Sequence, residues 1–136
     1  MRYIDGGVCA SKGFKATGHN AGIKNNVKND MALLFSEMPC VKAGTFTTNR
    51  VCAAPVKWDK KVVFESKSAQ AIVVNSGIAN ACTGEEGYEE CREMAAKTAA
   101  KLGIDEDAVL VASTGVIGKQ LPMDIIGKGI ERLPGQ

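Results

Sequence analysis

The stretch VLVASTGVIGKQLPMD, Val109 to Asp124, joins a strand to a helix through a segment rich in hydrogen-bond donors. The apolar run Val109–Ala112 predicts a strand buried on both faces. Pro122 suits the first turn of a helix that we expect to extend to Leu133. The intervening Ser113-Thr114-Gly115 has two explanations. It is either a plain turn, or a turn whose backbone N–H groups and hydroxyl contact a reacting oxygen.

A second strand and helix precede this stretch. The run AQAIVVN predicts a buried strand at Ala71–Asn75, followed by the loop SGIANACTG. Thr83 and Glu86 have the spacing of a capping box for a helix at about Glu85–Leu102, and Gly103 is placed to end that helix in the left-handed conformation. The order strand, helix, strand, helix predicts an α/β domain. If the strands are parallel, their two loops open at one sheet edge, where such sheets bind ligands.

The first half of the chain is less regular. Asp30–Glu37 and Val41–Thr48 are predicted to be two strands, joined as a hairpin through Met38-Pro39-Cys40. The residues Val62-Val63-Phe64 fit either a short strand or part of a helix. No internal repeat or linker divides the sequence. We therefore expect residues 1–136 to form one α/β domain, a mixed β-sheet flanked by helices.

Composition narrows the class of protein. The 136 residues are 45% apolar and 24% charged with a net charge of +2, as in soluble globular proteins. The charges form no basic stripe, which argues against a nucleic-acid partner. The chain shows no signal peptide and no apolar run long enough for a membrane span. The five cysteines include no CxxC pair, so they predict neither a zinc site nor a disulfide framework. We expect reduced, mostly buried thiols in a cytoplasmic protein.

Several catalytic motifs are excluded by their spacing. A Walker phosphate loop would need glycine at Ser113 and a hydroxyl residue at Gln120. Serine hydrolysis would need a histidine near a GxSxG elbow. His19 is the only histidine, and no such elbow exists. What remains is the donor pair Thr114-Gly115, for which the residues alone leave both a structural turn and an oxyanion hole open.

Other reactive side chains have ordinary structural explanations. Cys82 lies just before a helix N-terminus, where a thiolate would be stabilised, but a structural role is the simpler prediction. The acidic pairs Glu85-Glu86 and Glu89-Glu90 fall at the start of the same helix. Negative charge is favourable there without any catalytic role, so we expect these side chains to be exposed.

The sequence as a whole resembles the N-terminal part of the bifunctional ornithine acetyltransferase/glutamate N-acetyltransferase family of arginine biosynthesis. The resemblance covers nearly the whole chain, and TFTTNRVCAAPV and ASTGVIG are its most specific motifs. One departure is Ile78, where the family motif usually reads Ser-Gly-Asn-Ala-Asn-Ala. The segments that carry the resemblance are GGVCASKGFKATGHNAGIK (Gly6–Lys24), KNDMALLFSEMPCVKAGTFTTNRVCAAPV (Lys28–Val56), AIVVNSGIANACTGEEG (Ala71–Gly87) and VLVASTGVIGKQLPMD (Val109–Asp124).

The resemblance implies a mechanism. Family members are made as a precursor that cleaves itself before a threonine, which then heads the β chain and acts as the nucleophile. This threonine takes the acetyl group from N-acetylornithine and passes it to glutamate. Some members also accept acetyl-CoA as a substrate, and no cofactor or metal is implied. A Thr-Gly pair holds the oxyanion, and carried over to this sequence the pair is Thr114 and Gly115.

The resemblance also implies partners and an end point. The family's α chain pairs with its β chain in an α2β2 heterotetramer in the cytoplasm, with no nucleic acid and no membrane. That α chain runs beyond the position of Gln136, and the nucleophile lies further on. We therefore expect residues 1–136 to be an α-chain domain truncated before the autocleavage site, and inactive alone. The alternative is a non-catalytic structural or binding domain that keeps the family fold.

Overall fold

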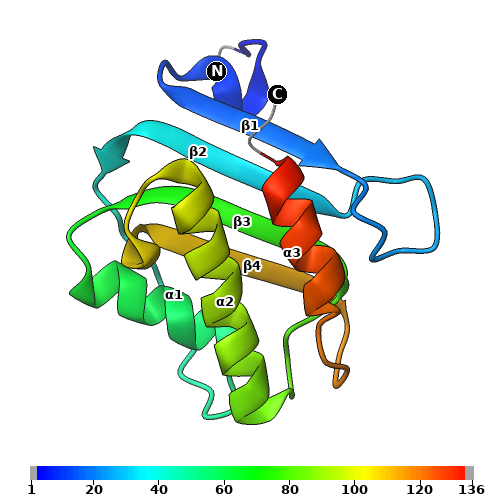
Figure 1. The fold of residues 1–136 in the computed structure, drawn as a ribbon. Helices are drawn as coiled ribbons and strands as arrows, with labels where there is room; N and C mark the ends of the chain where they lie inside the picture. The colour runs from blue at the N-terminus through cyan, green and yellow to red at the C-terminus, as the bar shows by residue number, and fades with distance from the viewer. Residues whose placement is uncertain (1–2, 134–136) are drawn as a thin grey trace.

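The computed structural model describes residues 3–133, which form a four-stranded sheet with helices packed against it (Figure 1). The strand order is β1-β2-β3-β4. The first two pairings are antiparallel and β3 pairs with β4 in parallel, so the predicted mixed sheet is confirmed. The elements are η1 (Gly7–Ala10), β1 (Phe14–His19), β2 (Met31–Cys40), α1 (Ala54–Glu65), β3 (Ala69–Ile78), α2 (Gly84–Leu102), η2 (Glu106–Ala108), β4 (Val109–Val116) and α3 (Met123–Arg132).

One face of the sheet carries the core. Leu33, Val73 and Val111 lie side by side in the register of β2, β3 and β4, and all three are buried. Helices α2 and α3 cover this face (Figure 1). Met94 of α2 and Ile126 of α3 are fully buried against it. Alternate residues of each strand point into this layer. Strands β3 and β4 therefore form as predicted, but the expected burial on both faces is wrong, because Ile72 and Leu110 on the other face are only half-buried.

Helices α2 and α3 lie where the sequence predicted them, with one error at the start of α2. Gly103 ends α2 in the left-handed conformation, with φ of 69° and ψ of 36°, as expected. The capping box is wrong, because Thr83 makes no side-chain cap. Its hydroxyl instead donates to Asn80 Oδ1 at 2.5 Å, and Glu86 Oε2 accepts from Gln120 Nε2 at 3.1 Å. Both side chains of the expected capping box form hydrogen bonds with residues of neighbouring loops instead.

The predicted hairpin at Met38-Pro39-Cys40 is also wrong. A single strand, β2, runs through these residues to Cys40, and residues 41–48 form no strand. Proline cannot donate to a strand ladder, and here it falls where the register between β2 and β3 shifts, between Phe35 and Cys40. The irregularity accommodates Pro39 inside a strand.

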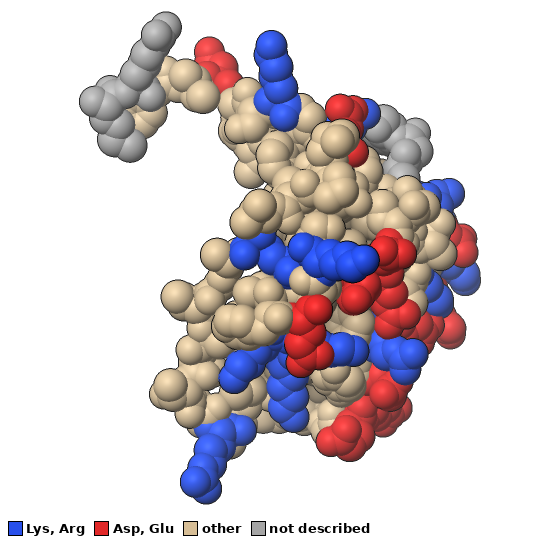
Figure 2. Space-filling model, turned by 90° about the vertical axis from the view of Figure 1, so that its left-hand side faces the viewer, with Lys and Arg blue, Asp and Glu red and all other residues tan. Residues whose placement is uncertain are grey.

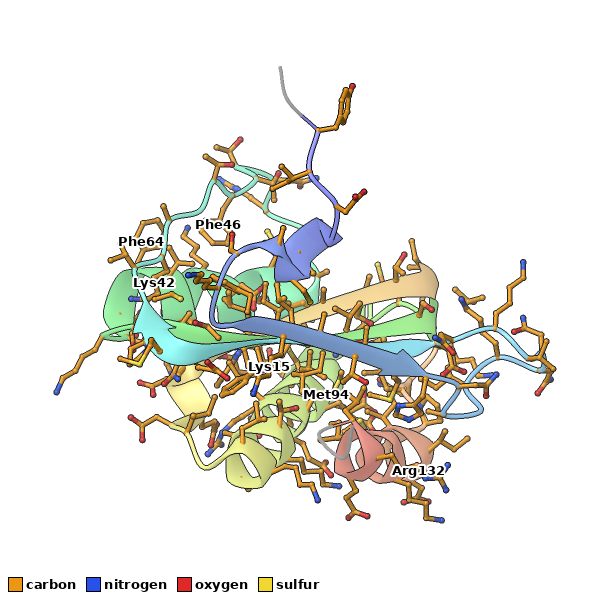
Figure 3. All side chains as sticks on the ribbon, turned by 90° about the horizontal axis from the view of Figure 1, so that it is seen from above. Lys15, Lys42, Phe46, Phe64, Met94 and Arg132 are labelled. Atoms are coloured by element: carbon orange, nitrogen blue, oxygen red, sulfur yellow. The ribbon has the colours of Figure 1, made fainter. Side chains whose placement is uncertain are left out.

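The opposite face of the sheet is less covered. Figure 3 shows the segment after β2 on the side of the sheet away from α2 and α3, with Phe46 pointing toward Phe64 of α1. Their ring centroids are 5.7 Å apart. Val62 is buried in α1, so the alternatives for Val62-Val63-Phe64 resolve in favour of a helix. Elsewhere this face carries half-buried apolar side chains, among them Leu34, Ile72 and Leu110.

The surface corrects two expectations. Of the five cysteines, Cys91 alone is buried, while Cys9 and Cys82 are exposed, so mostly buried thiols were a wrong prediction. Glu90 is buried, although it was expected at an exposed helix start. In Figure 2 acidic side chains gather along one side of the visible face and basic side chains lie beside them. In the part of the chain that the structure describes, no helix has the length and apolarity to cross a membrane.

Candidate functional site

The ends of β3 and β4 lie side by side at one edge of the sheet, as the predicted parallel pairing required. Both strands run further than the apolar runs indicated, because Ser76, Gly77 and Ile78 pair with Thr114, Gly115 and Val116. The sequence Ser-Thr-Gly is therefore part of strand β4 and not the turn that follows it. Thr114 and Gly115 are both exposed.

Gly115 has a conformation that few other residues adopt. Its φ is 134°, a region that L side chains avoid. A Cβ at this position would collide with the backbone of Gly77 and lie 2.6 Å from the amide nitrogen of Ile78. The close approach of β3 and β4 at their ends thus depends on glycine at Gly115.

Helix α1 covers the first half of the outer edge of β4. Trp58 Nε1 donates to the carbonyl oxygen of Val109 at 2.8 Å, and the backbone N–H of Val111 donates to Asp59 Oδ1 at 2.9 Å. Peptide groups alternate in direction along a strand, so those of odd-numbered residues face this outer edge. By the same alternation the N–H of Gly115 also faces the outer edge of β4. Gly115 lies beyond the two residues that contact α1, and it is exposed.

Hydrogen bonds tie the two loops after β3 and β4 together. The N–H of Asn80 donates to Ser113 Oγ at 2.9 Å, and that hydroxyl donates to the carbonyl oxygen of Ile78 at 3.2 Å. The N–H of Ala79 donates to the carbonyl oxygen of Val116 at 2.8 Å. Ser113, the first residue of the Ser-Thr-Gly segment, is therefore structural, while the Thr114 side chain is exposed.

The loop of residues 20–30, between β1 and β2, also reaches this edge of the sheet. The sequence did not predict this. Figure 1 shows the loop on the same side of the molecule as the ends of β3 and β4. The N–H of Ser76 donates to the carbonyl oxygen of Asp30 at 2.8 Å, which attaches the loop to β3. Asparagines and a glycine are frequent in this segment, but no motif in the sequence placed it beside Thr114.

The Asp30 carboxylate holds the loop in shape. It accepts hydrogen bonds from the backbone N–H groups of Ala21 at 2.6 Å, Ile23 at 2.7 Å and Lys24 at 3.0 Å. Burial raises the pKa of Asp30, but these hydrogen bonds lower it by more, so the net pKa lies below the ordinary value. The carboxylate therefore stays ionised, and its charge is satisfied by the loop backbone.

Two other carboxyl groups have pKa values raised by burial. Burial raises the pKa of Asp59 to about 6, and the hydrogen bond from Val111 opposes this rise. Burial also raises the pKa of Glu90, and the nearby charges of Glu86 and Glu93 add to the effect. Glu90 Oε2 accepts the N–H of Leu121 at 3.3 Å, so it anchors the segment that leads into α3.

A cavity of about 260 Å³ lies beside these loops, between the starts of α1 and α2. Ile117, Cys82 and Lys57 are among its lining residues. Cys82, at the turn before α2, is exposed and has a positive φ of 56°. Among residues 3–133, no group of three or more His, Cys, Asp or Glu side chains could hold a metal ion.

The remaining candidate, His19, lies away from Thr114. It is the last residue of β1, half-buried and paired with Met31, and β1 and β4 are the two outer strands of the sheet. Within the described residues its Nε2 atom has no hydrogen-bond partner. The structure therefore does not bring His19 together with Thr114 and Gly115.

Comparisons with known proteins agree with this architecture. The chain is 56% identical over 119 residues to "Arginine biosynthesis bifunctional protein ArgJ 1" of Clostridium acetobutylicum, covering 88% of this chain and 29% of the relative. It is 53% identical to the ArgJ protein of Caldanaerobacter subterraneus, covering 96% of this chain and 32% of that relative. The chain thus spans about a third of the length of these curated relatives.

Solved structures are similar over most of the chain. A crystal structure of the Bacillus halodurans protein of the same name superposes with a TM-score of 0.89 at 43% identity, covering 94% of this chain and 66% of the matched chain. The Mycobacterium tuberculosis ornithine acetyltransferase, crystallised with ornithine, gives a TM-score of 0.90 at 41% identity, covering 95% of this chain and 69% of that one. The sequence model of the ArgJ family matches residues 15–136. The chain therefore belongs to the ArgJ family.

Proposed function

We propose that residues 1–136 are the N-terminal third of an acetyltransferase of arginine biosynthesis that moves the acetyl group of N-acetylornithine to glutamate. The acetyl group is carried by a threonine nucleophile located beyond this chain. Thr114 and Gly115 provide the oxyanion hole. Because the nucleophile is not among residues 1–136, these residues alone are inactive. Acetyl-CoA is a possible second acetyl donor, and no cofactor is required.

The observation that carries this proposal is the open edge of β4 at Gly115. Helix α1 occupies the edge at Val109 and Val111 but not at Gly115, whose N–H faces the same way. The exposed Thr114 hydroxyl lies next to it in the chain. Fixed donors of this kind stabilise the negative charge that develops on an acyl oxygen in the transition state. Because the strand pairing with Gly77 fixes the backbone, the Gly115 N–H needs little reorganisation during the reaction.

Chain lengths among the relatives support a precursor that is cut in two. The chain covers 29% and 32% of two curated relatives, but 66% and 69% of the matched chains in the two crystal structures. The matched crystal chains are therefore about half as long as the curated relatives. Separate α and β chains of similar length, joined in an α2β2 assembly, would give this ratio.

The test uses a hybrid protein, in which residues 1–136 are followed by the remaining two thirds of the Clostridium acetobutylicum relative. This hybrid is called the complete enzyme below. Replacing Thr114 with Ala should lower kcat for acetyl transfer by roughly 10²–10³-fold, the usual effect of removing one oxyanion donor. The KM should change little, because the oxyanion exists only in the transition state. Transfer is measured on the fully cleaved fraction, so that slower self-cleavage is not counted as slower transfer.

The exposed Thr48 provides a matched control, and Thr48→Ala should transfer acetyl groups at the unmodified rate. If cleaved Thr114→Ala enzyme is equally fast, the oxyanion assignment is wrong and Thr114 is only a strand residue. If the unmodified complete enzyme transfers no acetyl group, the alternative of a structural or binding domain with the family fold is favoured instead.

A further inference from the structure

The loop of residues 20–30 brings a lysine to the edge where Thr114 and Gly115 lie. We propose that Lys24 is a substrate-binding residue that pairs with the α-carboxylate of the N-acyl amino acid whose acyl oxygen is held at Thr114-Gly115. This proposal rests on the proposed function. It adds the feature of the substrate that the chain would recognise, a carboxylate next to the acylated nitrogen.

The backbone at Lys24 is held in place from two directions. Its N–H donates to the buried Asp30 carboxylate at 3.0 Å, and Asp30 is joined to β3 through the N–H of Ser76. On the other side the loop packs against α3, because a Cβ at Gly129 would lie 2.9 Å from Ala21. The loop is thus anchored to the strand that pairs with Thr114.

The Lys24 side chain extends over the end of β3. A Cβ at Gly77 would lie 3.0 Å from Lys24 Cγ and 3.7 Å from Lys24 Cε, so the aliphatic part of the lysine occupies the space above this glycine. Gly77 pairs directly with Gly115. The aliphatic part of Lys24 thus lies over the residue of β3 that pairs with Gly115.

Lys24 has no acidic partner in residues 3–133, where the ion pairs join Lys15 to Glu37, Arg92 to Glu89 and Glu106, and Lys97 to Glu93. Asp30, the nearest carboxylate on its own loop, is committed to backbone N–H groups. The ammonium group is thus available to pair with an external anion.

The spacing suits a single small ligand. Neighbouring strands lie about 4.8 Å apart, which separates the backbone of Gly77 from that of Gly115. In an N-acyl amino acid, three covalent bonds of about 1.3–1.5 Å separate the acyl carbon from the carboxylate carbon, placing them roughly 3–4 Å apart. The Gly115 N–H faces away from β3, so an acyl oxygen bound to it lies about 2.9 Å further out from the β4 backbone. The ligand must therefore lie across the end of β4, with its carboxylate toward the flexible lysine above β3.

N-acetylornithine and glutamate both carry this carboxylate, so the pair should form with the donor and with the acceptor. In the complete enzyme, Lys24→Met should raise the KM for both by about 10–100-fold, the effect of losing a hydrogen bond to a charged group. The kcat should change much less, because the carboxylate is equally charged in substrate and transition state. Lys24→Arg should restore most of the affinity.

Lys28→Met is the matched control, since Lys28 is an exposed lysine of the same loop, and its KM values should stay within twofold of the unmodified enzyme. The specific readout is N-acetyl-1,4-diaminobutane, which equals N-acetylornithine without its carboxylate. Lys24→Met should process this compound as the unmodified enzyme does. Lys24→Gln, which keeps the aliphatic chain over Gly77, replaces the Met variant if the latter does not fold.

Two results would overturn the proposal. The first is an unchanged KM for N-acetylornithine in Lys24→Met or Lys24→Gln. The second is an equal rise in KM for the carboxylate-free compound, which would make Lys24 a structural residue. Either result requires an active unmodified enzyme, so it is distinct from failure of the proposed function, in which the unmodified enzyme transfers no acetyl group.

Discussion

Gly77 and Gly115 face each other across β3 and β4, and both have positive φ, 116° and 134°. Their neighbours restrict them differently. The space above Gly77 is filled by side chains of the 20–30 loop, whereas the space at Gly115 is filled by the β3 backbone. A side chain can move aside more easily than a paired strand can. Gly115 is therefore the less replaceable of the two.

Gly118 allows a matched test of Gly115, because its φ is also positive at 77° but no atom lies near its added Cβ. Gly118→Ala should cost about 1–2 kcal/mol of unfolding free energy, from backbone strain alone. Gly115→Ala should cost about 1–3 kcal/mol more, because overpacking is added to strain. Urea denaturation of the chain measures both. Equal losses would show that β4 moves away from β3 without penalty.

At the scale of elements, helix α1 covers part of the edge of β4 that has no neighbouring strand. An uncovered edge strand exposes unpaired N–H and carbonyl groups. Trp58 and Asp59, consecutive residues of α1, pair with Val109 and Val111 and so cover two of these groups. The position of the helix thereby defines where the open part of the edge begins.

Asp59 makes this contact dependent on pH. Its pKa in the folded chain is raised from 3.8 to about 6, so between these values the native state binds more protons than the unfolded chain. The free energy of unfolding should therefore fall as pH rises from about 4 to 6, by roughly 1–2 kcal/mol after solvent screening of this half-buried group is taken into account, and stay level above. Asp59→Asn removes this component, and its amide oxygen still accepts the Val111 N–H.

The comparison is the unfolding free energy of Asp59→Asn minus that of the unmodified chain, measured from pH 4 to pH 8. This difference should rise through the range from 4 to 6, while other titrating groups contribute equally to both proteins and cancel. A flat difference would mean that Asp59 titrates as an ordinary solvent-exposed carboxylate, and that burial by α1 has little effect on it.

The elements show which parts of the fold could be predicted from sequence. Strands β3 and β4 were predictable because their runs of apolar residues are buried by α2 and α3, and local composition records that burial. The strand through Pro39 was not, because a register shift that tolerates proline arises from pairing with a distant strand. The capping box failed because Asn80 and Gln120 compete for its side chains.

The candidate site divides in the same way. Thr114 and Gly115 were identified from a motif within one segment, and their parallel partner strand followed from the order of elements. Lys24 and Asp59 were not identified, because each reaches the site through contacts between segments about 50 residues apart or more. Neither has a local spacing pattern that marks it.

At the scale of the whole molecule, the two faces of the sheet are unequally covered. Helices α2 and α3 pack on one face, whereas the other is partly covered by the segment after β2 (Figures 1 and 3). On that second face, Leu34 and Ile72 line a cavity of about 210 Å³ with Val41, whose side chain is fully exposed. Phe64 of α1 is 65% exposed. Apolar surface of this kind marks a contact with other protein.

Residues 1–136 on their own should therefore self-associate through this second face. Sedimentation velocity should show an average mass that rises with concentration. Ile72→Glu should shift that association to higher concentration, because a carboxylate would have to lose its water in the contact. Val27→Glu is the matched control: Val27 is 95% exposed in the 20–30 loop, away from this face, so this variant should associate like the unmodified chain.

In the complete enzyme the remaining two thirds should cover the second face, and Ile72→Glu should then weaken assembly with that part. A chain that stays monomeric at all concentrations, or that associates equally with Ile72→Glu, would show that the partly covered face is stable in water without a partner.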